Sequence, residues 1–233
     1  MGKFDIIGLI LSYVYAFGLL LIVEAIGKKL SWPQDLTRKI IHIGAGMWVW
    51  GILYFFDHWY YGIIPFATFI ILNYLFYRKE TFKAMDKTDS TPGTVYFAIS
   101  ITVLFLWLWR SGSTDNKVHL AVAAVMAMTW GDAFASLVGK KWGIKTYEVF
   151  KHKRSWIGSS AMFLFSLVVI YLTFALLPGS ELAPMIQSIP AEKIFLVSLA
   201  GAVVATISES VSPAGTDNLT VPLLTGFALW LLV

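Results

Sequence analysis

The stretch IIGLILSYVYAFGLLLIVEAI, residues 6–26, decides the fold class of this chain. Within it, only Glu24 carries a charge. A bilayer hydrocarbon core about 30 Å thick requires roughly 20 consecutive apolar residues of a helix that crosses it. Residues 6–26 are therefore predicted to form a membrane-spanning helix.

Apolar stretches of this kind recur along all 233 residues. Hydrophobic residues make up 58% of the chain and charged residues 14%, whereas about a quarter of the residues in a soluble domain are charged. Because no polar region is long enough to fold by itself, we expect one all-α transmembrane domain over residues 1–233, a polytopic membrane protein with about eight spans. The expected spans are residues 6–26, 40–56, 60–76, 95–109, 120–138, 159–177, 194–211 and 219–233.

The sequence contains no cysteine. This excludes a disulfide framework, a thiolate nucleophile and a metal bound by cysteine. Any chemistry must come from carboxylates, imidazoles, hydroxyls and basic groups.

The basic residues favour one orientation. Most of the 18 lysines and arginines fall in three alternate loops, and the positive-inside rule places such loops in the cytoplasm, with both termini on the extracytoplasmic side. The net charge of +4 then reflects topology, so we expect no nucleic-acid partner. The expected cytoplasmic face comprises residues 27–39, 77–94, 139–158 and 208–219. Its basic residues are Lys28, Lys29, Arg38, Lys39, Arg78, Lys79, Lys83, Lys87, Lys140, Lys141, Lys145, Lys151, Lys153 and Arg154.

Polar residues inside or beside the spans indicate a site, because such residues are costly in a membrane unless they have partners. The first group is Arg38, Lys39 and His42. Arg38 and His42 are one helical turn apart, so two positive charges and an imidazole share one face. The alternative is anchoring by Arg38 and Lys39, with His42 as a bystander.

Asp132 forms the second group. It precedes the expected end of its span by about six residues, which places it roughly 9 Å inside at 1.5 Å per residue. An aspartate within a span costs about 2.5–3.5 kcal/mol, so Asp132 is expected to face a cation. A purely structural salt bridge to a lysine of another helix is the alternative.

A glycine-rich basic loop follows Asp132. It contains Gly139, Lys140 and the run Lys153-Arg154-Ser155, and it leads into Gly158-Ser159 at the start of a span. The backbone N–H groups and the positive dipole end of a helix attract anions, and glycine allows a phosphate to approach closely. The pattern indicates a phosphate site; an ordinary hydrophilic loop is the alternative.

The last group joins the two final spans. It carries Glu209, Asp217 and Asn218 but no lysine or arginine. Such oxygen ligands suit Mg²⁺, which usually takes one or two carboxylates together with phosphates and water. The alternative is a capped turn between helices.

These groups together resemble a known family of membrane enzymes. The resemblance rests on five ordered motifs: Arg38-Lys39-x-x-His42, Gly131-Asp132-Ala133-x-Ala135, Gly139-x-x-x-Gly143, Lys153-Arg154-Ser155-Trp156-x-Gly158-Ser159, and Glu209 followed by Asp217-Asn218-Leu219-Thr220-Val221-Pro222. The pattern is similar to the membrane polyprenol kinase group, which includes dolichol kinase, phytol kinase and CTP-dependent diacylglycerol kinase, and looks most like the phytol kinase branch. The resemblance implies transfer of the terminal phosphate of a nucleoside triphosphate, typically CTP, to a lipid alcohol such as phytol, farnesol, geranylgeraniol or a polyprenol, with Mg²⁺.

The groups and the resemblance assign roles. We expect Asp132 to accept the proton of the alcohol, with His42 as second candidate, and Lys153 to act on the phosphates. The expected metal residues are Asp132, Glu209 and Asp217. The expected nucleotide-binding residues are Arg38, Lys39, Gly139, Lys140, Lys153, Arg154, Ser155, Gly158, Ser159 and Asn218. The tail of the alcohol would lie between spans, and membrane lipids would surround the protein; the sequence leaves the oligomeric state open.

One position departs from the family pattern. Ile157 stands where a glutamate is expected between Trp156 and Gly158. If that position contributes to metal or nucleotide binding, the chain is slow, relies on Glu209 or Asp217, or is a non-catalytic lipid-binding relative. Two further alternatives are cytidylyl transfer to phosphatidate and membrane transport.

Overall fold

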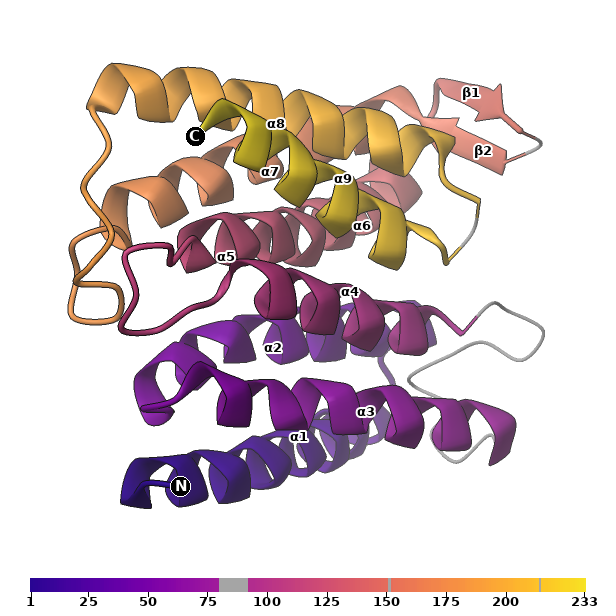
Figure 1. Ribbon diagram of the computed structural model, residues 1–233. Coiled ribbons are helices and arrows are strands. Elements are labelled where there is room, and N and C mark those ends of the chain that lie inside the picture. Colours follow the sequence, from indigo (N-terminus) through magenta and orange to yellow (C-terminus); the bar gives the residue numbers. More distant parts are fainter. Residues whose placement is uncertain (80–91, 151, 214) are drawn as a thin grey trace.

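The computed structural model describes residues 1–79, 92–150, 152–213 and 215–233. Helices dominate it, and their axes run in roughly the same direction across the molecule (Figure 1). The helical elements are α1 (Lys3–Lys29), α2 (Gln34–Phe55), α3 (Trp59–Lys79), α4 (Gly93–Leu108), α5 (Val118–Met126), η1 (Ala127–Asp132), α6 (Ala133–Trp142), α7 (Trp156–Leu176), α8 (Ala191–Val211) and α9 (Asp217–Leu232). The strands are β1 (Thr146–Val149) and β2 (His152–Ser155).

The expected all-α fold is confirmed, apart from the hairpin that β1 and β2 form. Each expected span falls largely within a helix. Among the described residues, five helices are long and apolar enough to cross a membrane: α1, α3, the continuous run α5–η1–α6, α7 and α8. The helices α4 and α9 are apolar but shorter. The count of eight spans and the orientation of the termini stay predictions. Lys83, Lys87 and Lys151 lie outside the described residues.

The run α5–η1–α6 is the buried centre of the bundle. Every residue of α5 is buried, and small side chains such as Ala121 and Ala124 let α7 and α9 pack closely against it. Its middle section, η1, is a π-helix. In η1 a Cβ on Gly131 would lie 2.5 Å from Ser166 Oγ, so glycine is needed where η1 meets α7. π-Helical turns are rare and often occur at functional sites.

The hairpin replaces what the sequence predicted as a loop. β1 and β2 pair antiparallel, with Thr146 opposite Ser155. The Tyr147 hydroxyl anchors β1 to two helices, because it shares hydrogen bonds with Ser159 Oγ of α7 at 2.6 Å and with Ser210 Oγ of α8 at 2.9 Å. The chain then enters α7 directly from β2. The hairpin thus holds the basic loop against the helix ends.

Candidate active site

A cavity of about 610 Å³ lies where the ends of several helices meet. All of the predicted site residues line it, although they come from α2, η1, α6, β2, α7, α8 and α9. These residues are Arg38, Lys39, His42, Asp132, Gly139, Lys140, Lys153, Arg154, Ser155, Gly158, Ser159, Glu209, Asp217 and Asn218. The fold therefore brings together residues up to 180 positions apart in the numbering, from Arg38 to Asn218. Their individual roles stay predictions.

The first turns of four helices contribute to the cavity wall. Arg38 comes from the start of α2, Thr94 from α4, Ser159 from α7 and Asn218 from α9. Each helix presents the positive end of its dipole at its N-terminus. This convergence favours a negatively charged ligand.

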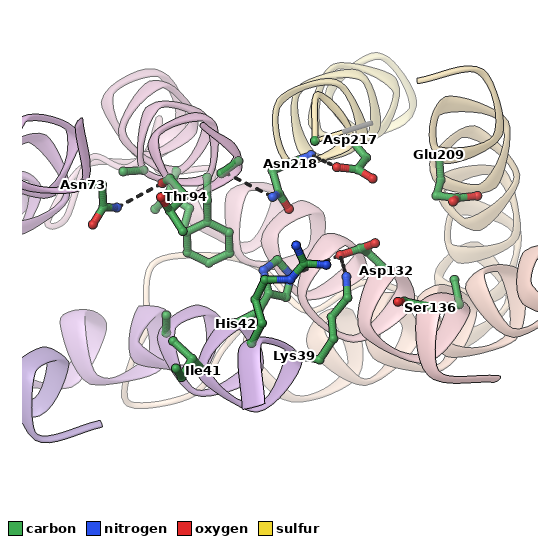
Figure 2. A pocket seen from close by; sticks show the side chains of 18 of the residues that line it. Lys39, Ile41, His42, Asn73, Thr94, Asp132, Ser136, Glu209, Asp217 and Asn218 are labelled. Atoms are coloured by element: carbon green, nitrogen blue, oxygen red, sulfur yellow. Dashed lines mark hydrogen bonds and ion pairs between the residues drawn. The ribbon is translucent and has the colours of Figure 1, made fainter. Parts of the chain in front are cut away.

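Lys39 is the cation that faces Asp132. Its Nζ donates a hydrogen bond to Asp132 Oδ2 at 2.6 Å, and both side chains are about nine-tenths buried. His42 Nε2 lies 3.7 Å from the same oxygen. Figure 2 shows Lys39 and Asp132 pointing toward each other, with His42 beside them and with Asp217 and Asn218 on the helix opposite. The pair links α2 to η1 as a structural salt bridge, and both of its side chains line the cavity.

Arg154 holds the other two acidic side chains. Its Nη1 lies 3.1 Å from Glu209 Oε1 and its Nη2 lies 3.8 Å from Asp217 Oδ2. The same Nη2 donates to the carbonyl oxygens of Glu209 and Ser212, at 3.2 and 3.1 Å. Arg154 therefore ties the hairpin to the end of α8 and the start of α9. Its first effect is to position Glu209 and Asp217.

The acidic residues of the cavity fit Mg²⁺ only if other ligands, such as phosphates and water, complete its coordination. Among the described residues, no three histidine, cysteine or acidic side chains lie close enough to hold a metal by themselves. Asp132 is paired with Lys39, and Glu209 and Asp217 are paired with Arg154. Mg²⁺ commonly binds through one or two carboxylates plus phosphates and water. The site therefore suits a metal that enters with a polyphosphate.

The expected phosphate cradle is partly occupied by the protein itself. Ser155 is the N-cap of α7, and its Oγ accepts a hydrogen bond from Gly158 N at 3.1 Å. A Cβ on Gly158 would lie 3.0 Å from the carbonyl oxygen of Ala135, so this glycine also lets α6 and α7 approach. By contrast Lys153 is exposed, lines the cavity and has no ion pair within the described part of the chain. Lys140 pairs with Asp35.

The structure adds residues that the sequence reasoning missed. Asn73, buried in α3, donates from Nδ2 to the carbonyl oxygen of Thr94 at 3.0 Å, and both line the cavity. Ser136 lies one turn after Asp132 on the same wall. Asn73 was detectable, because a polar residue within an apolar span calls for a partner. Figure 2 shows Asn73 and Thr94 on the side of the site away from Glu209.

Asn218 presents an unused acceptor to the cavity. Its Nδ2 donates to the carbonyl oxygen of Gly93 at 3.2 Å, while its buried Oδ1 has no partner among the described residues. A buried polar atom without a partner costs about 1–3 kcal/mol. A ligand hydroxyl or amino group would satisfy it.

The cavity continues into an apolar branch between α1, α2, α3 and α4. Its wall there includes Tyr15, Ala45, Trp48, Phe69 and Phe97. Charged groups and apolar rings thus line one continuous space, a combination that suits a ligand with a polar head and a hydrocarbon tail.

No family model and no solved structure matches the chain. The chain is 29% identical over 221 residues to a protein named phytol kinase from Synechocystis sp., which covers 94% of this chain and 89% of that protein. It is 27% identical over 232 residues to a probable phytol kinase, chloroplastic, of Triticum aestivum, covering 93% and 74% of the two chains. It is 28% identical over 251 residues to a farnesol kinase, chloroplastic, of Arabidopsis thaliana, covering 96% and 76%.

Proposed function

Because the chain is related over most of its length to a phytol kinase-type group of prenol kinases, we propose that it phosphorylates an isoprenoid alcohol in the membrane. The donor would be a nucleoside triphosphate, and we propose CTP, on the strength of the motif resemblance. The cofactor would be Mg²⁺, and the site would face the cytoplasm. Two relatives named for different alcohols, phytol and farnesol, support an isoprenoid acceptor without selecting one.

The observation that carries the proposal is that one cavity has both a charged part and an apolar part. Its charged part contains Lys39, Asp132 and Lys153, and its apolar branch is lined by residues of α1, α2, α3 and α4. A water-soluble acceptor would have no use for the branch. A lipid alcohol would place its hydroxyl among the charges and its tail among the apolar side chains.

The proposed step is an in-line transfer. The alcohol oxygen forms a bond to the terminal phosphorus, the bond from that phosphorus to the bridging oxygen breaks, and the nucleoside diphosphate leaves. The hydroxyl proton passes to Asp132, with His42, 3.7 Å from Asp132, as the second candidate. The products are a prenyl monophosphate and a nucleoside diphosphate.

The remaining residues position the phosphates and neutralise their charge. Lys153 is the most available cation, and Arg38 and Lys140 extend the positive rim, each also bonded to Asp35. Arg154 acts through Glu209 and Asp217, which it holds in place. A bound Mg²⁺ would neutralise charge on the phosphate oxygens, with Asp132, Glu209 and Asp217 as its protein-side residues. Phosphoryl transfer depends mainly on such positioning and charge neutralisation.

The experiment is a transfer assay with purified protein in detergent or lipid nanodiscs. Phytol, farnesol, geranylgeraniol, diacylglycerol and phosphatidate are each offered with CTP, ATP or UTP labelled on the terminal phosphate, and with CTP labelled on the α-phosphate. We expect terminal label on a prenyl phosphate with CTP, and no α-label on the product. Label from the α-phosphate on phosphatidate would instead identify cytidylyl transfer. A folded protein that labels no alcohol from any nucleotide would refute the proposal.

A further inference from the structure

The apolar branch is lined by residues of four helices. On α2 the cavity-lining residues Lys39, His42, Ala45 and Trp48 follow at intervals of three. Successive members are neighbours on the helix surface, so the four form one stripe. Because a turn takes 3.6 residues, this stripe winds about half way around α2 between Lys39 and Trp48. The stripe begins at a charge beside Asp132 and ends at an aromatic ring. The branch is thus a path that leads away from the reacting groups.

The branch has a limited depth. From Lys39 to Trp48 the axis of α2 rises about 13 Å, and from Thr94 to Ile101 the axis of α4 rises about 10 Å, at 1.5 Å per residue. The residues at the deep end are enclosed, since Ser12 and Ile101 are each 1% exposed. The cavity lining on α2 and α4 thus extends over about two to two and a half helical turns.

Trp48 is held firmly at this closed end. Its Nε1 donates a hydrogen bond to Ser12 Oγ at 3.1 Å, and its ring stacks on Tyr15 with 4.4 Å between centroids and 19° between planes. The Tyr15 hydroxyl in turn donates to the carbonyl oxygen of Gly44 at 2.8 Å. An aromatic ring fixed both at its edge and on its face cannot move aside without breaking these contacts. It forms a rigid end to the branch.

We infer that this branch binds the tail of the alcohol and that Trp48 sets the length of chain that it admits. The inference rests on the proposed function, and it adds the place of the tail and a specificity-determining residue. The hydroxyl would lie near Asp132 and Asn218, and the chain would pass Ala45 toward Trp48. The whole cavity, about 610 Å³, must also hold the phosphates, so the branch suits one chain of limited length.

The test compares chain-length profiles of kcat/KM for geraniol, farnesol, geranylgeraniol and a long polyprenol. Trp48→Phe enlarges the deep end of the apolar branch. It is expected to raise the ratio of kcat/KM for longer alcohols to kcat/KM for shorter ones. Ala45→Leu narrows the branch one turn nearer the charged end without removing a bond, and should lower that ratio at least about tenfold, because a few methylenes in an apolar pocket discriminate this strongly. Tyr54→Phe is the matched control on α2, since Tyr54 is 69% exposed on the outside of the helix and should leave the profile unchanged.

An unchanged profile in both cavity variants, with normal turnover of farnesol, would overturn the inference while leaving the proposed function in place. A second readout does not depend on catalysis. A farnesol analogue with a photoreactive group at its far end should label the α1 and α2 segments around Ser12 and Trp48 in the wild-type protein. Labelling confined to other helices would overturn the inference even if no alcohol were phosphorylated.

Discussion

Two buried aspartates, at opposite ends of the bundle, show how differently the same side chain is used. Asp5 lies in the first turn of α1, close to the N-terminus of the chain marked in Figure 1. Its side chain is completely buried. Its two oxygens accept hydrogen bonds from Gly2 N at 2.7 Å, from the backbone of Asp57 and of His58 at 3.1 Å each, and from His58 Nδ1 at 2.8 Å. A carboxylate offers about four acceptor positions, so Asp5 is fully used in closing the α2–α3 turn onto α1.

Asp132 uses much less of its bonding capacity. Within the described residues its one close partner is Lys39, through Oδ2, and the side chain faces the cavity. Both aspartates are buried, and both have a compensating partner. Of the two, only Asp132 has unused acceptor positions and lies beside a cavity. On this difference, rather than on burial, we base the proposal that Asp132 is a functional residue and Asp5 a structural one.

The largest expected effect is that of Asp132→Asn. The amide keeps the shape but cannot take the hydroxyl proton, so kcat should fall by about 10²–10⁴-fold, the usual contribution of a general base. Turnover is measured per mole of folded protein, with farnesol and labelled CTP.

This variant also leaves the Lys39 charge unpaired, which can cost about 3–5 kcal/mol of stability at a buried site. The double variant Asp132→Asn with Lys39→Gln removes both charges and should regain much of the thermal stability without regaining activity. Near wild-type turnover in folded Asp132→Asn would reduce the pair to a structural salt bridge and remove Asp132 from the reaction.

Asp5→Ala should produce the opposite result. It leaves several buried N–H groups without an acceptor, each worth about 1–3 kcal/mol, so the midpoint of thermal unfolding should fall clearly. The kcat per mole of folded protein should stay unchanged, because the cluster lies at the opposite end of the bundle from the charged residues of the cavity. A tenfold loss of kcat at unchanged stability would contradict the contrast drawn between the two aspartates.

Lys153→Ala is expected to have a smaller effect, on nucleotide binding. Lys153 is an exposed cation on the cavity rim, and a charge-assisted contact worth about 1.4 kcal/mol corresponds to roughly a tenfold rise in the KM for the nucleotide. The matched control is Lys141→Ala, because Lys141 is also exposed but stacks on Trp142 outside the cavity lining. Equal shifts of KM in the two variants would mean that only the overall surface charge matters.

Much of the fold and the membership of the site could be predicted from the sequence, because the cost of polar groups in an apolar chain is a local property. Asp132 in a span requires a cation whatever the fold. That the cation is Lys39 depends on how α2 packs against η1, and no local pattern encodes this. The role of Arg154 as a clamp on Glu209 and Asp217 was missed for the same reason, and the short strands β1 and β2, four residues each, gave too little alternation to detect.

The residues that line the apolar branch could not be predicted. A side chain that faces lipid, one in a packed core and one that lines a cavity are equally apolar, since lipid tails resemble side chains in polarity. From the sequence alone, Trp48 cannot be told from the tryptophans that anchor spans at the membrane interface. Its hydrogen bond to Ser12 and its stacking on Tyr15 distinguish it, and both depend on the pairing of α1 with α2.

The smallest effect is expected at the position that departs from the family pattern. The Ile157 side chain is 42% exposed and lies beside Trp142, Ile144 and Trp156, in a hollow separate from the charged cavity as far as the described residues show. Ile157→Glu should therefore change kcat/KM less than about twofold, as is usual for a surface position away from the reacting groups. The measurement is the farnesol assay, with Ile157→Gln as the uncharged control. A gain of activity in the glutamate variant alone would contradict this expectation. It would mean that the first turn of α7 adopts another conformation during turnover and brings residue 157 into the cavity. The contrast between paired and available carboxylates would then have to include position 157, where this chain has no carboxylate.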